Sequence, residues 1–277
     1  MNQSANPKIS IVTPSFNQAK FLEETILSVL NQNYPNLEYI IIDGGSTDGS
    51  LEIIQKYEKH LTYWVSEPDS GQSNAINKGF KHAKGELFGW INSDDYYLPD
   101  AFSAVAGAYR NSVKPSAIVG IGRWVDQNGK DLGEHTPKKV DPESIVACGE
   151  NWIPQPACFF PAEAFRKVGG IDEKLHYAMD FDLFVKLSKN IPFVKLDKCI
   201  SVALSHPKAK TKASRGKMFA EVRLIQIKNG GEKYALDALY YDYTKLLWYE
   251  SLTRHLKNSF IYRLFRKSAK KSIFGSP

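Results

Sequence analysis

Long hydrophobic runs are absent from this sequence, whose longest apolar stretches are four or five residues, such as 39–42. A helix that crosses a bilayer needs at least about 18 consecutive apolar residues. We therefore expect no membrane-spanning helix. The first eight residues are polar and lack the apolar core of a secretory signal, so we expect a cytoplasmic protein.

Cysteine is also scarce. The chain contains only Cys148, Cys158 and Cys199, and no two of them have the C-x-x-C spacing. An odd number of cysteines without that spacing argues against a disulfide framework and against a cysteine-rich zinc site. We expect reduced thiols in or near the core.

Two phosphate-binding signatures are missing as well. No G-x-G-x-x-G follows the first apolar run, and no glycine-rich stretch ends in Gly-Lys-Ser or Gly-Lys-Thr. These absences argue against a dinucleotide-binding Rossmann domain and against a P-loop protein. With 43% hydrophobic and 24% charged residues, the chain has the composition of a folded protein and is not disordered as a whole.

The net charge of +6 is confined to one end of the chain. Residues 241–277 contain eight lysines and arginines and two acidic residues, which leaves 28 of each sign in residues 1–240. A nucleic-acid-binding protein more often spreads its basic residues over the folded domain. We therefore expect no nucleic acid partner.

Short β-rich runs alternate with helical patterns over the first hundred residues, which predicts an α/β fold with a mostly parallel sheet covered by helices. After about residue 112 the pattern changes, and a hairpin around Asn128-Gly129 implies a mixed sheet. Residues 205–217 are polar and basic, which predicts a mobile loop. Strands are expected at 9–13, 37–43, 62–66, 87–91, 117–121, 123–126, 130–134 and 193–196, and helices at 99–110, 162–168 and 180–189.

Polar residues follow each of the first four predicted strands, in the segments 13–17, 43–49, 67–72 and 92–95. Ligands of open α/β sheets bind outside the carboxyl ends of the strands. One such loop alone is ordinary turn chemistry, but four together favour a ligand site. The adjacent carboxylates Asp94 and Asp95 offer the oxygen ligands that Mg²⁺ and Mn²⁺ prefer. A nucleoside diphosphate bridged to the protein by a metal ion fits this edge.

Seven segments, in order along about residues 1–215, resemble the successive motifs of glycosyltransferase family 2, whose members are inverting enzymes with a GT-A fold. The segments are ISIVTPSFN (9–17), IIDGGSTDGS (41–50), GQSNAINKG (71–79), WINSDD (90–95), WIPQPA (152–157), VGGIDE (168–173) and YAMDFDL (177–183). The resemblance implies a GT-A domain over 1–215, with a nucleotide-binding half at 1–112 and an acceptor-binding half with a lid loop at 113–215. A helical, basic extension would follow at 216–277.

The resemblance also implies roles for single residues. Asp43 would bond the base, Asp94 the ribose or sugar, and Asp95 would ligate the metal. The chain departs from the family where Asn92 and Met179 replace the usual Asp and Glu. The nucleotide-sugar contacts as a whole would come from Thr13, Pro14, Ser15, Asn17, Asp43, Gly44, Ser46, Gln72, Asn74 and Asp94.

Sugar transfer by single displacement needs a base that takes the proton of the acceptor hydroxyl. Asp180 is the candidate, and its alternative role is to cap the helix at 180–189. His206 would contact the metal or the diphosphate, or would simply be solvated. Trp152 and Gln155 would shape the sugar or acceptor site, although an aromatic residue there could equally belong to the core.

The sequence near the C-terminus, 260–274, combines apolar and basic residues with helical spacing. Such a segment can lie in the interface of an anionic membrane, which would suit a lipid-linked acceptor. Alternatively, its apolar side packs on the domain while its charges face water.

Together these observations predict a metal-dependent hexosyl- or N-acetylhexosaminyltransferase, peripheral to the inner face of the membrane, that uses Mn²⁺ or Mg²⁺. It would move a sugar from a nucleotide sugar, most simply a UDP-sugar, to a glycan or lipid-linked acceptor in cell-surface polysaccharide synthesis. One alternative is a nucleotidyltransferase, although the segment 13–17 lacks the expected glycine-rich, arginine-containing loop. The other is a nucleotide-sugar-binding module without turnover, because of Asn92 and Met179.

Overall fold

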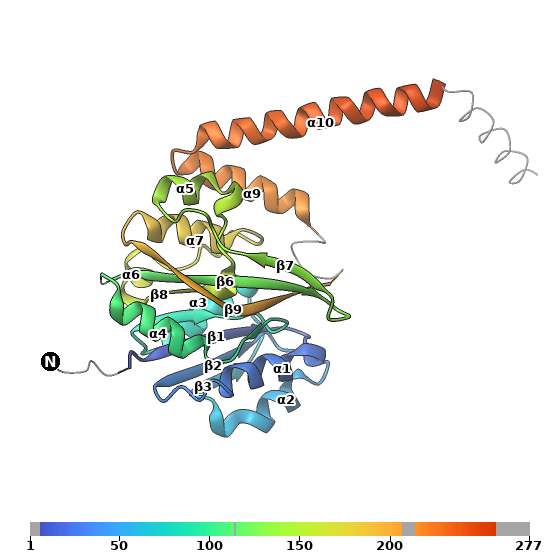
Figure 1. Ribbon diagram of the computed structural model, residues 1–277. Coiled ribbons are helices and arrows are strands. Elements are labelled where there is room, and N and C mark those ends of the chain that lie inside the picture. The colour runs from blue at the N-terminus through green and yellow to red at the C-terminus, as the bar shows by residue number, and fades with distance from the viewer. Residues whose placement is uncertain (1–5, 114, 207–213, 259–277) are drawn as a thin grey trace, which may run out of the picture.

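Strands from both halves of the chain join one curled sheet in the computed structural model, which describes residues 6–113, 115–206 and 214–258 (Figure 1). Within these residues the sheet has nine strands in the order β3-β2-β1-β4-β8-β6-β9-β5, and β7 pairs with β6. The strands are β1 (Ile9–Ser15), β2 (Leu37–Asp43), β3 (Tyr63–Ser66), β4 (Leu87–Trp90), β5 (Tyr96–Tyr97), β6 (Ala117–Asp126), β7 (Asp131–His135), β8 (Cys158–Pro161) and β9 (Phe193–Ser205).

The helices are α1 (Ala19–Leu30), α2 (Ser50–Tyr57), α3 (Gln72–His82), α4 (Ala101–Asn111), α5 (Pro142–Ala147), α6 (Ala162–Lys167), α7 (Met179–Ser188), α9 (Arg215–Lys228) and α10 (Glu232–Asn258), with short 3-10 turns η1 (Glu58–His60), η2 (Gly149–Asn151) and η3 (Gln155–Ala157). Strands β3, β2, β1 and β4 run parallel, and antiparallel β8 joins them to β6. The predicted fold class, a mixed and mostly parallel sheet flanked by helices, is confirmed.

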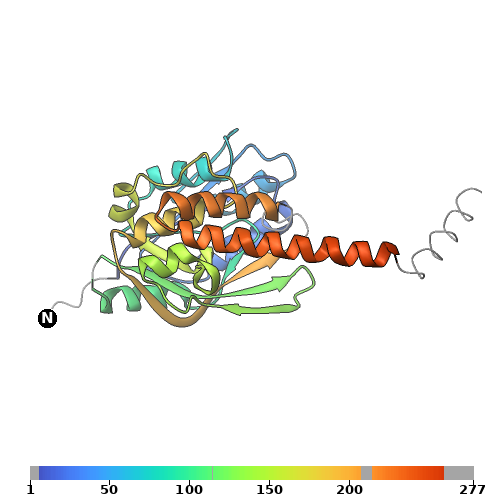
Figure 2. The same ribbon diagram turned by 90° about the horizontal axis from the view of Figure 1, so that it is seen from above.

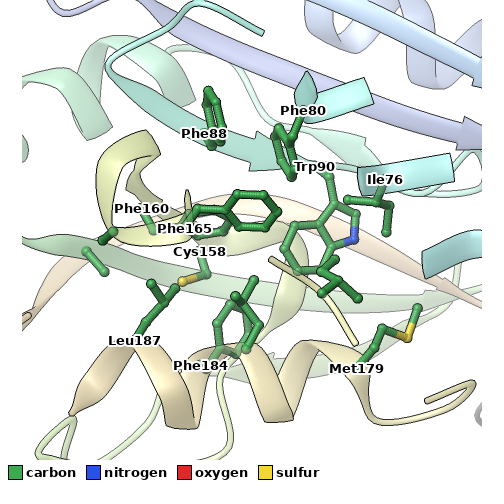
Figure 3. Close-up of a cluster of buried hydrophobic side chains, with 14 of the residues drawn as sticks. Ile76, Phe80, Phe88, Trp90, Cys158, Phe160, Phe165, Met179, Phe184 and Leu187 are labelled. Atoms are coloured by element: carbon green, nitrogen blue, oxygen red, sulfur yellow. The ribbon is translucent and has the colours of Figure 1, made fainter. Parts of the chain in front are cut away.

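Alternating residues of the central strands belong to two different hydrophobic clusters, because successive side chains of a strand point to opposite faces of the sheet. On β2, Ile42 belongs to one cluster and Ile41 to the other. In the first cluster, helix α3 contributes Phe80, which stacks on Phe88 of β4 with a ring-centroid distance of 4.5 Å (Figure 3). Figure 3 also places Met179 of α7 in this cluster.

The second half of the sheet differs from the sequence prediction. Strand β9 continues to Ser205, far beyond the predicted end at residue 196, and β6 is one strand where two were expected. Strands β5 and β8 were not predicted. The hairpin between β6 and β7 is confirmed, and its Gly129 has φ +77°, a conformation that favours glycine.

The predicted loop at 205–217 is shorter in the structure, since β9 includes Ser205 and α9 begins at Arg215. Residues 207–213 lie outside the described residues. The three cysteines are free thiols, as expected, and Cys158 is buried. None of the helices in the described ranges is both long and apolar enough to span a bilayer.

Helices α9 and α10 form a hairpin after the last strand, and they differ in how they meet the body. Helix α9 packs on it through Gln226, whose Nε2 donates to the carbonyl oxygens of Val146 (2.9 Å) and Ala147 (3.1 Å). Helix α10 contacts the body only near its start and then projects away from it (Figures 1 and 2).

Gly79 is the point where α3 lies closest to the sheet. A methyl group there would lie 2.5 Å from Cγ1 of Val12, and forcing extra atoms into a packed core costs about 1–3 kcal/mol. We expect Gly79→Ala to lower the free energy of unfolding by about that amount in urea titrations. Gly107 of α4 has no atom within 4 Å of the corresponding position, so Gly107→Ala should not destabilise the protein. Equal stability of the two variants would contradict this packing argument.

Candidate active site at the carboxyl edge of the sheet

The loops after β1, β2 and β3 are held side by side by the strand register and by hydrogen bonds. Ser15 lies opposite Asp43 in the register of β1 and β2. Beyond it, the backbone N–H of Asn17 donates to Ser46 Oγ (2.8 Å), and the N–H of Thr47 donates to Asn17 Oδ1 (2.9 Å). The predicted convergence of these loops on one edge is therefore present, and Asn17 and Ser46 hold it together.

Asp43 is fully buried and maintains the loop that follows β2. Its Oδ2 accepts hydrogen bonds from Ser66 Oγ (2.6 Å) and from the N–H groups of Gly45 (3.1 Å) and Ser46 (2.8 Å). Its Oδ1 accepts from Ser46 Oγ (2.5 Å). Both oxygens are engaged by the protein, so the carboxylate organises the loop, and its bond to the base stays a prediction.

Phe16 and Asp69 lie close to Gly44 of this loop. A Cβ atom at Gly44 would lie 3.0 Å from Asp69 Oδ2 and 3.3 Å from Cδ2 of Phe16. The Phe16 side chain is 60% exposed although it adjoins this buried loop, and Asp69 Oδ1 accepts from the N–H of Gly71 (2.8 Å). An exposed ring and a carboxylate oxygen thus flank a backbone without a side chain. The sequence interpretation assigned no role to Phe16 or Asp69, although both lie in segments that it singled out.

The adjacent carboxylates after β4 have different environments. Asp95 is buried, and its two oxygens accept from the N–H of Leu204 (3.0 Å) and from Nδ2 of Asn92 (3.1 Å). Burial and the neighbouring charge of Asp94 raise the pKa of Asp95 well above its usual value. Asp94 keeps 18% of its side chain exposed, and its Oδ2 lies 3.0 Å from Nε2 of His206. The structure therefore brings Asp94 together with His206 and encloses Asp95 in the protein.

Three side-chain amides form a hydrogen-bonded chain at the same edge of the sheet. Gln72 Nε2 donates to Asn92 Oδ1 (2.7 Å), and Asn92 Nδ2 donates to Gln155 Oε1 (3.3 Å). Gln155 in turn donates to the carbonyl oxygen of Trp90 (2.8 Å). An amide at position 92 can both accept and donate, which an ionised aspartate cannot. Asn74 lies apart from this chain and donates to Glu173 Oε2 (3.0 Å).

Asp180 is the second residue of α7, and its Oδ1 accepts from the N–H of Phe181 (2.8 Å). Burial raises the pKa of the Cys158 thiol well above its usual value, and the charge of Asp180 raises it further. The charge of Asp180 therefore acts on Cys158 of β8, the strand that follows Gln155. Met179, where the family often has glutamate, is buried in the core.

One side chain of α9 holds the backbone that leads into α7. Glu221 Oε1 accepts from the N–H of His176 (3.0 Å), and its Oε2 accepts from the N–H groups of Tyr177 (2.8 Å) and Ala178 (2.9 Å). These donors precede the first helical residue, where free N–H groups need partners. Helix α9 therefore contributes directly to the segment that carries Asp180, a role that the sequence interpretation did not assign.

Trp152 forms an aromatic group with two residues of the β6–β7 hairpin. Its ring stacks on His135 at a centroid distance of 4.1 Å and meets Trp124 edge-on at 4.9 Å. His135 Nε2 lies 2.9 Å from the carbonyl oxygen of Trp152, and burial lowers the pKa of His135. Trp152 remains 37% exposed, so the group offers an aromatic surface and is not part of the core.

The donor set determines which metal ion could fit. The part of the chain that the structure describes contains no group of three or more His, Cys, Asp or Glu side chains suited to a metal. Mg²⁺ is usually held by one or two protein carboxylates and by phosphate oxygens of the substrate. Asp94 supplies one such carboxylate and His206 adds an imidazole nitrogen in contact with it, which fits an ion shared with a diphosphate.

The fold and this edge define a glycosyltransferase of the GT-A type. A profile of the family described as Glycosyl transferase family 2 matches residues 10–153. The chain belongs to this family, which confirms the prediction made from its motifs.

Sequence relatives cover about two thirds of the chain. An uncharacterized glycosyltransferase of Rickettsia typhi is 31% identical over 188 residues, which are 65% of this chain and 58% of that protein. The chondroitin synthase of Escherichia coli is 28% identical over 206 residues, 69% of this chain and 28% of the synthase. The chain thus spans little more than half the length of the first of these relatives and less than a third of the second.

Two solved structures share the fold. Residues 1–349 of Staphylococcus aureus TarS, in complex with UDP-GlcNAc, align with a TM-score of 0.61 at 21% identity, covering 79% of this chain and 65% of that one. The mannosyltransferase PcManGT of Pyrobaculum calidifontis, in complex with GDP-Man and Mn²⁺, aligns with a TM-score of 0.58 at 17% identity, covering 99% and 89%.

Proposed function

We propose that this protein is a metal-dependent, inverting glycosyltransferase that moves a sugar from a UDP-sugar to a hydroxyl of a glycan or lipid-linked acceptor in cell-surface polysaccharide synthesis. The observation that carries the proposal is the Asp94–His206 pair at the edge that also holds Phe16 and Asp69. The family and the sugar polymer made by the E. coli relative, chondroitin, support the reaction class. The UDP-GlcNAc bound to TarS supports the donor class.

The nucleobase would bind at the exposed ring of Phe16. The exposed face of Phe16 can stack on a planar ring, and the glycine at position 44 lets Phe16 and Asp69 lie close to the backbone. Asp69 Oδ2 lies beside the same glycine. It can accept a hydrogen bond from the imide N–H of uracil, a group that cytosine lacks. Asp43 would contribute indirectly, by fixing the loop. We also propose that the nucleotide pocket is lined by Thr13, Pro14, Ser15 and Ser46.

Asp94 and His206 would hold the divalent ion, in place of the predicted ligand Asp95. Both oxygens of Asp95 are engaged within the protein, whereas the facing atoms of Asp94 and His206 can ligate one ion together. When bound, Mn²⁺ or Mg²⁺ acts as a Lewis acid that stabilises the negative charge of the departing nucleoside diphosphate. The hydrogen bonds that join Gln72, Asn92 and Gln155 would hold these side chains in place at the sugar site.

Asp180 would be the base. In an inverting transfer the acceptor oxygen attacks the anomeric carbon while the bond to the diphosphate breaks on the opposite side, and the carboxylate takes the hydroxyl proton. A positioned base of this kind contributes about 10²–10⁴-fold to the rate. The exposed ring of Trp152, held by His135 and Trp124, would contact the apolar face of an acceptor sugar.

Glu221 would position this base without touching the substrate. We expect Glu221→Gln to lower kcat by about tenfold with little change in KM for the donor, because it weakens three charge-assisted hydrogen bonds at the start of α7. Glu221→Asp, which keeps the charge, should recover part of the loss. The matched control is Glu232→Gln on α10. A proportional loss of folded protein, measured by circular dichroism, would mean that Glu221 acts on stability alone.

The proposed function is tested by incubating the full chain with a panel of nucleotide sugars and Mn²⁺, with and without polysaccharide acceptors. Release of UDP and transfer of sugar from a UDP-sugar is the expected result. Tight UDP binding without turnover in every acceptor mixture would instead identify a nucleotide-sugar-binding module. Release of pyrophosphate from a nucleoside triphosphate and a sugar phosphate would identify a nucleotidyltransferase.

The basic sequence after residue 258 lies outside the described residues, and we propose that it attaches the protein to anionic lipid. Each Lys or Arg near such a surface contributes about 1 kcal/mol. Flotation with phosphatidylserine vesicles should therefore capture the full chain and lose a form truncated at residue 257. Equal flotation of both forms would remove this assignment.

A further inference from the structure

Helix α10 presents large apolar side chains to solvent on most of its surface. Every residue from 239 to 252 is exposed, although a helix that is apolar all round is normally buried. The helix projects from the body in both views, so no other described element covers it (Figures 1 and 2). The exposed apolar residues are Leu236, Leu239, Tyr240, Tyr241, Tyr243, Leu246, Leu247, Trp248, Tyr249 and Leu252.

Six of these residues have the spacing of a helix-packing seam. They follow one another at i, i+3, i+4, i+7, i+10 and i+11, the pattern that places side chains along one side of a helix for contact with another helix. We name them the α10 seam. Its members other than Leu236 are symmetric about Tyr243, which is 57% exposed, and Leu236 extends the seam at one end and is 62% exposed. The seam consists of Leu236, Leu239, Tyr240, Tyr243, Leu246 and Leu247.

The charges along α10 are divided between its two halves. Residues 232–244 contain three acidic residues and one lysine, whereas residues 245–257 contain three basic residues and one glutamate. The first half therefore carries −2 and the second half +2. A second α10 helix in antiparallel orientation would place each acidic half beside a basic half. A parallel pair would set like charges together, which is unfavourable.

We propose that α10 pairs with α10 of a second copy of this chain, antiparallel and seam against seam, with the two-fold axis close to Tyr243. Such an isologous contact is the ordinary arrangement of a homodimer. The helix is about 40 Å long at 1.5 Å per residue. A stable interface buries about 800 Å² on each partner, and six side chains, two of them tyrosines of about 150–250 Å² each, supply a large part of that area.

A lipid surface is the other class of partner that an apolar helix could meet, and the charges of α10 disfavour it. Helices that lie in a membrane interface carry a polar face rich in Lys and Arg. On α10 the net charges of the two halves cancel, and the polar residues outside the seam include the acidic Asp237 and Asp242. The dimer therefore forms without lipid, and this contact is separate from the catalytic proposal.

Light scattering coupled to size exclusion tests the dimer on the full chain. The expected mass is twice the 31.2 kDa of one chain. Leu239→Glu combined with Leu246→Glu, which places charge in the seam, should halve that mass. Tyr241→Glu combined with Leu252→Glu adds the same charge at two exposed positions on the opposite side of the helix and should leave the dimer intact. Circular dichroism and donor hydrolysis check that both variants are folded, since the proposed reaction involves no seam residue.

Cysteine cross-linking tests the orientation. An antiparallel pair centred on Tyr243 brings this position beside its own copy and sets position 236 beside position 250. Tyr243→Cys should therefore form a cross-linked dimer under mild oxidation, and Leu236→Cys alone should not. Equal cross-linking of both variants would overturn the antiparallel arrangement.

A wild-type mass of one chain at all concentrations up to about 100 μM would overturn the dimer itself, since a weaker contact would not bury the seam. A monomer whose binding to vesicles is lost in the seam variant, but kept in the Tyr241 and Leu252 control, would also overturn it. That result would assign the seam to lipid.

Discussion

Asp180→Asn should reduce sugar transfer by about 10²–10⁴-fold, the contribution of a positioned general base, while UDP binding in the presence of Mn²⁺ stays unchanged. The amide oxygen of asparagine can still accept the hydrogen bond from the N–H of Phe181 that Asp180 accepts now. The fold and the donor site are therefore preserved, and only the proton acceptor is lost. Single-turnover measurements with saturating donor and acceptor isolate this step.

The control for Asp180 lies one half-turn away on the same helix. Asp182 forms an ion pair with Lys186, with 2.6 Å between Oδ2 and Nζ. Asp182→Asn removes a charge from the same helical turn without touching the proposed base, so its turnover should stay within a few-fold of wild type. Equal losses in the two variants would show that charge at the start of α7, and not a base at position 180, is what matters.

Asp94→Ala should abolish the gain in UDP affinity that Mn²⁺ provides. Loss of an outer-shell partner of a metal ligand typically costs 10–100-fold in metal affinity, and loss of a direct ligand should cost at least as much. Titration calorimetry of UDP with and without Mn²⁺ measures this difference. His206→Ala should also reduce the gain in UDP affinity that Mn²⁺ provides.

Asp95→Asn is the matched comparison. An asparagine can still accept from the N–H of Leu204, so this variant should keep the metal-dependent affinity and should change mainly the stability of the β9 end. If Asp95→Asn loses the metal dependence while Asp94→Ala keeps it, the two roles are the reverse of those proposed here.

The strands of the first half could be predicted because their boundaries are local. The run 37–43 is apolar and is followed by turn residues, and its predicted bounds agree with those of β2. Strand β9 could not be predicted in full, because Asp197 and Lys198 break its apolar pattern. It continues because β6 on one side and β5 on the other pair with it, and those partners are distant in sequence.

Non-local contacts also explain what the sequence left undecided in the site. Asp94 and Asp95 are adjacent carboxylates, and contacts distant in sequence distinguish them: the N–H of Leu204, 109 residues from Asp95, and the ring of His206 beside Asp94. The enclosure of Asp43 depends in the same way on Ser66. The motifs identified the edge and the family, but they could not show which oxygen atoms remain free for a ligand. Phe16 and Asp69 could have been inferred from their places in two of the predicted loops.

The most direct test of the account is thermal unfolding of the full chain with UDP, with Mn²⁺ and with both together. A ligand at 100 times its dissociation constant stabilises the folded state by about 2.7 kcal/mol, so a clear rise in Tm is expected only when both are present. The rise should disappear with EDTA and in Asp94→Ala. An unchanged Tm in all mixtures, or an equal rise with UDP alone, would contradict a nucleotide site that is completed by a metal ion.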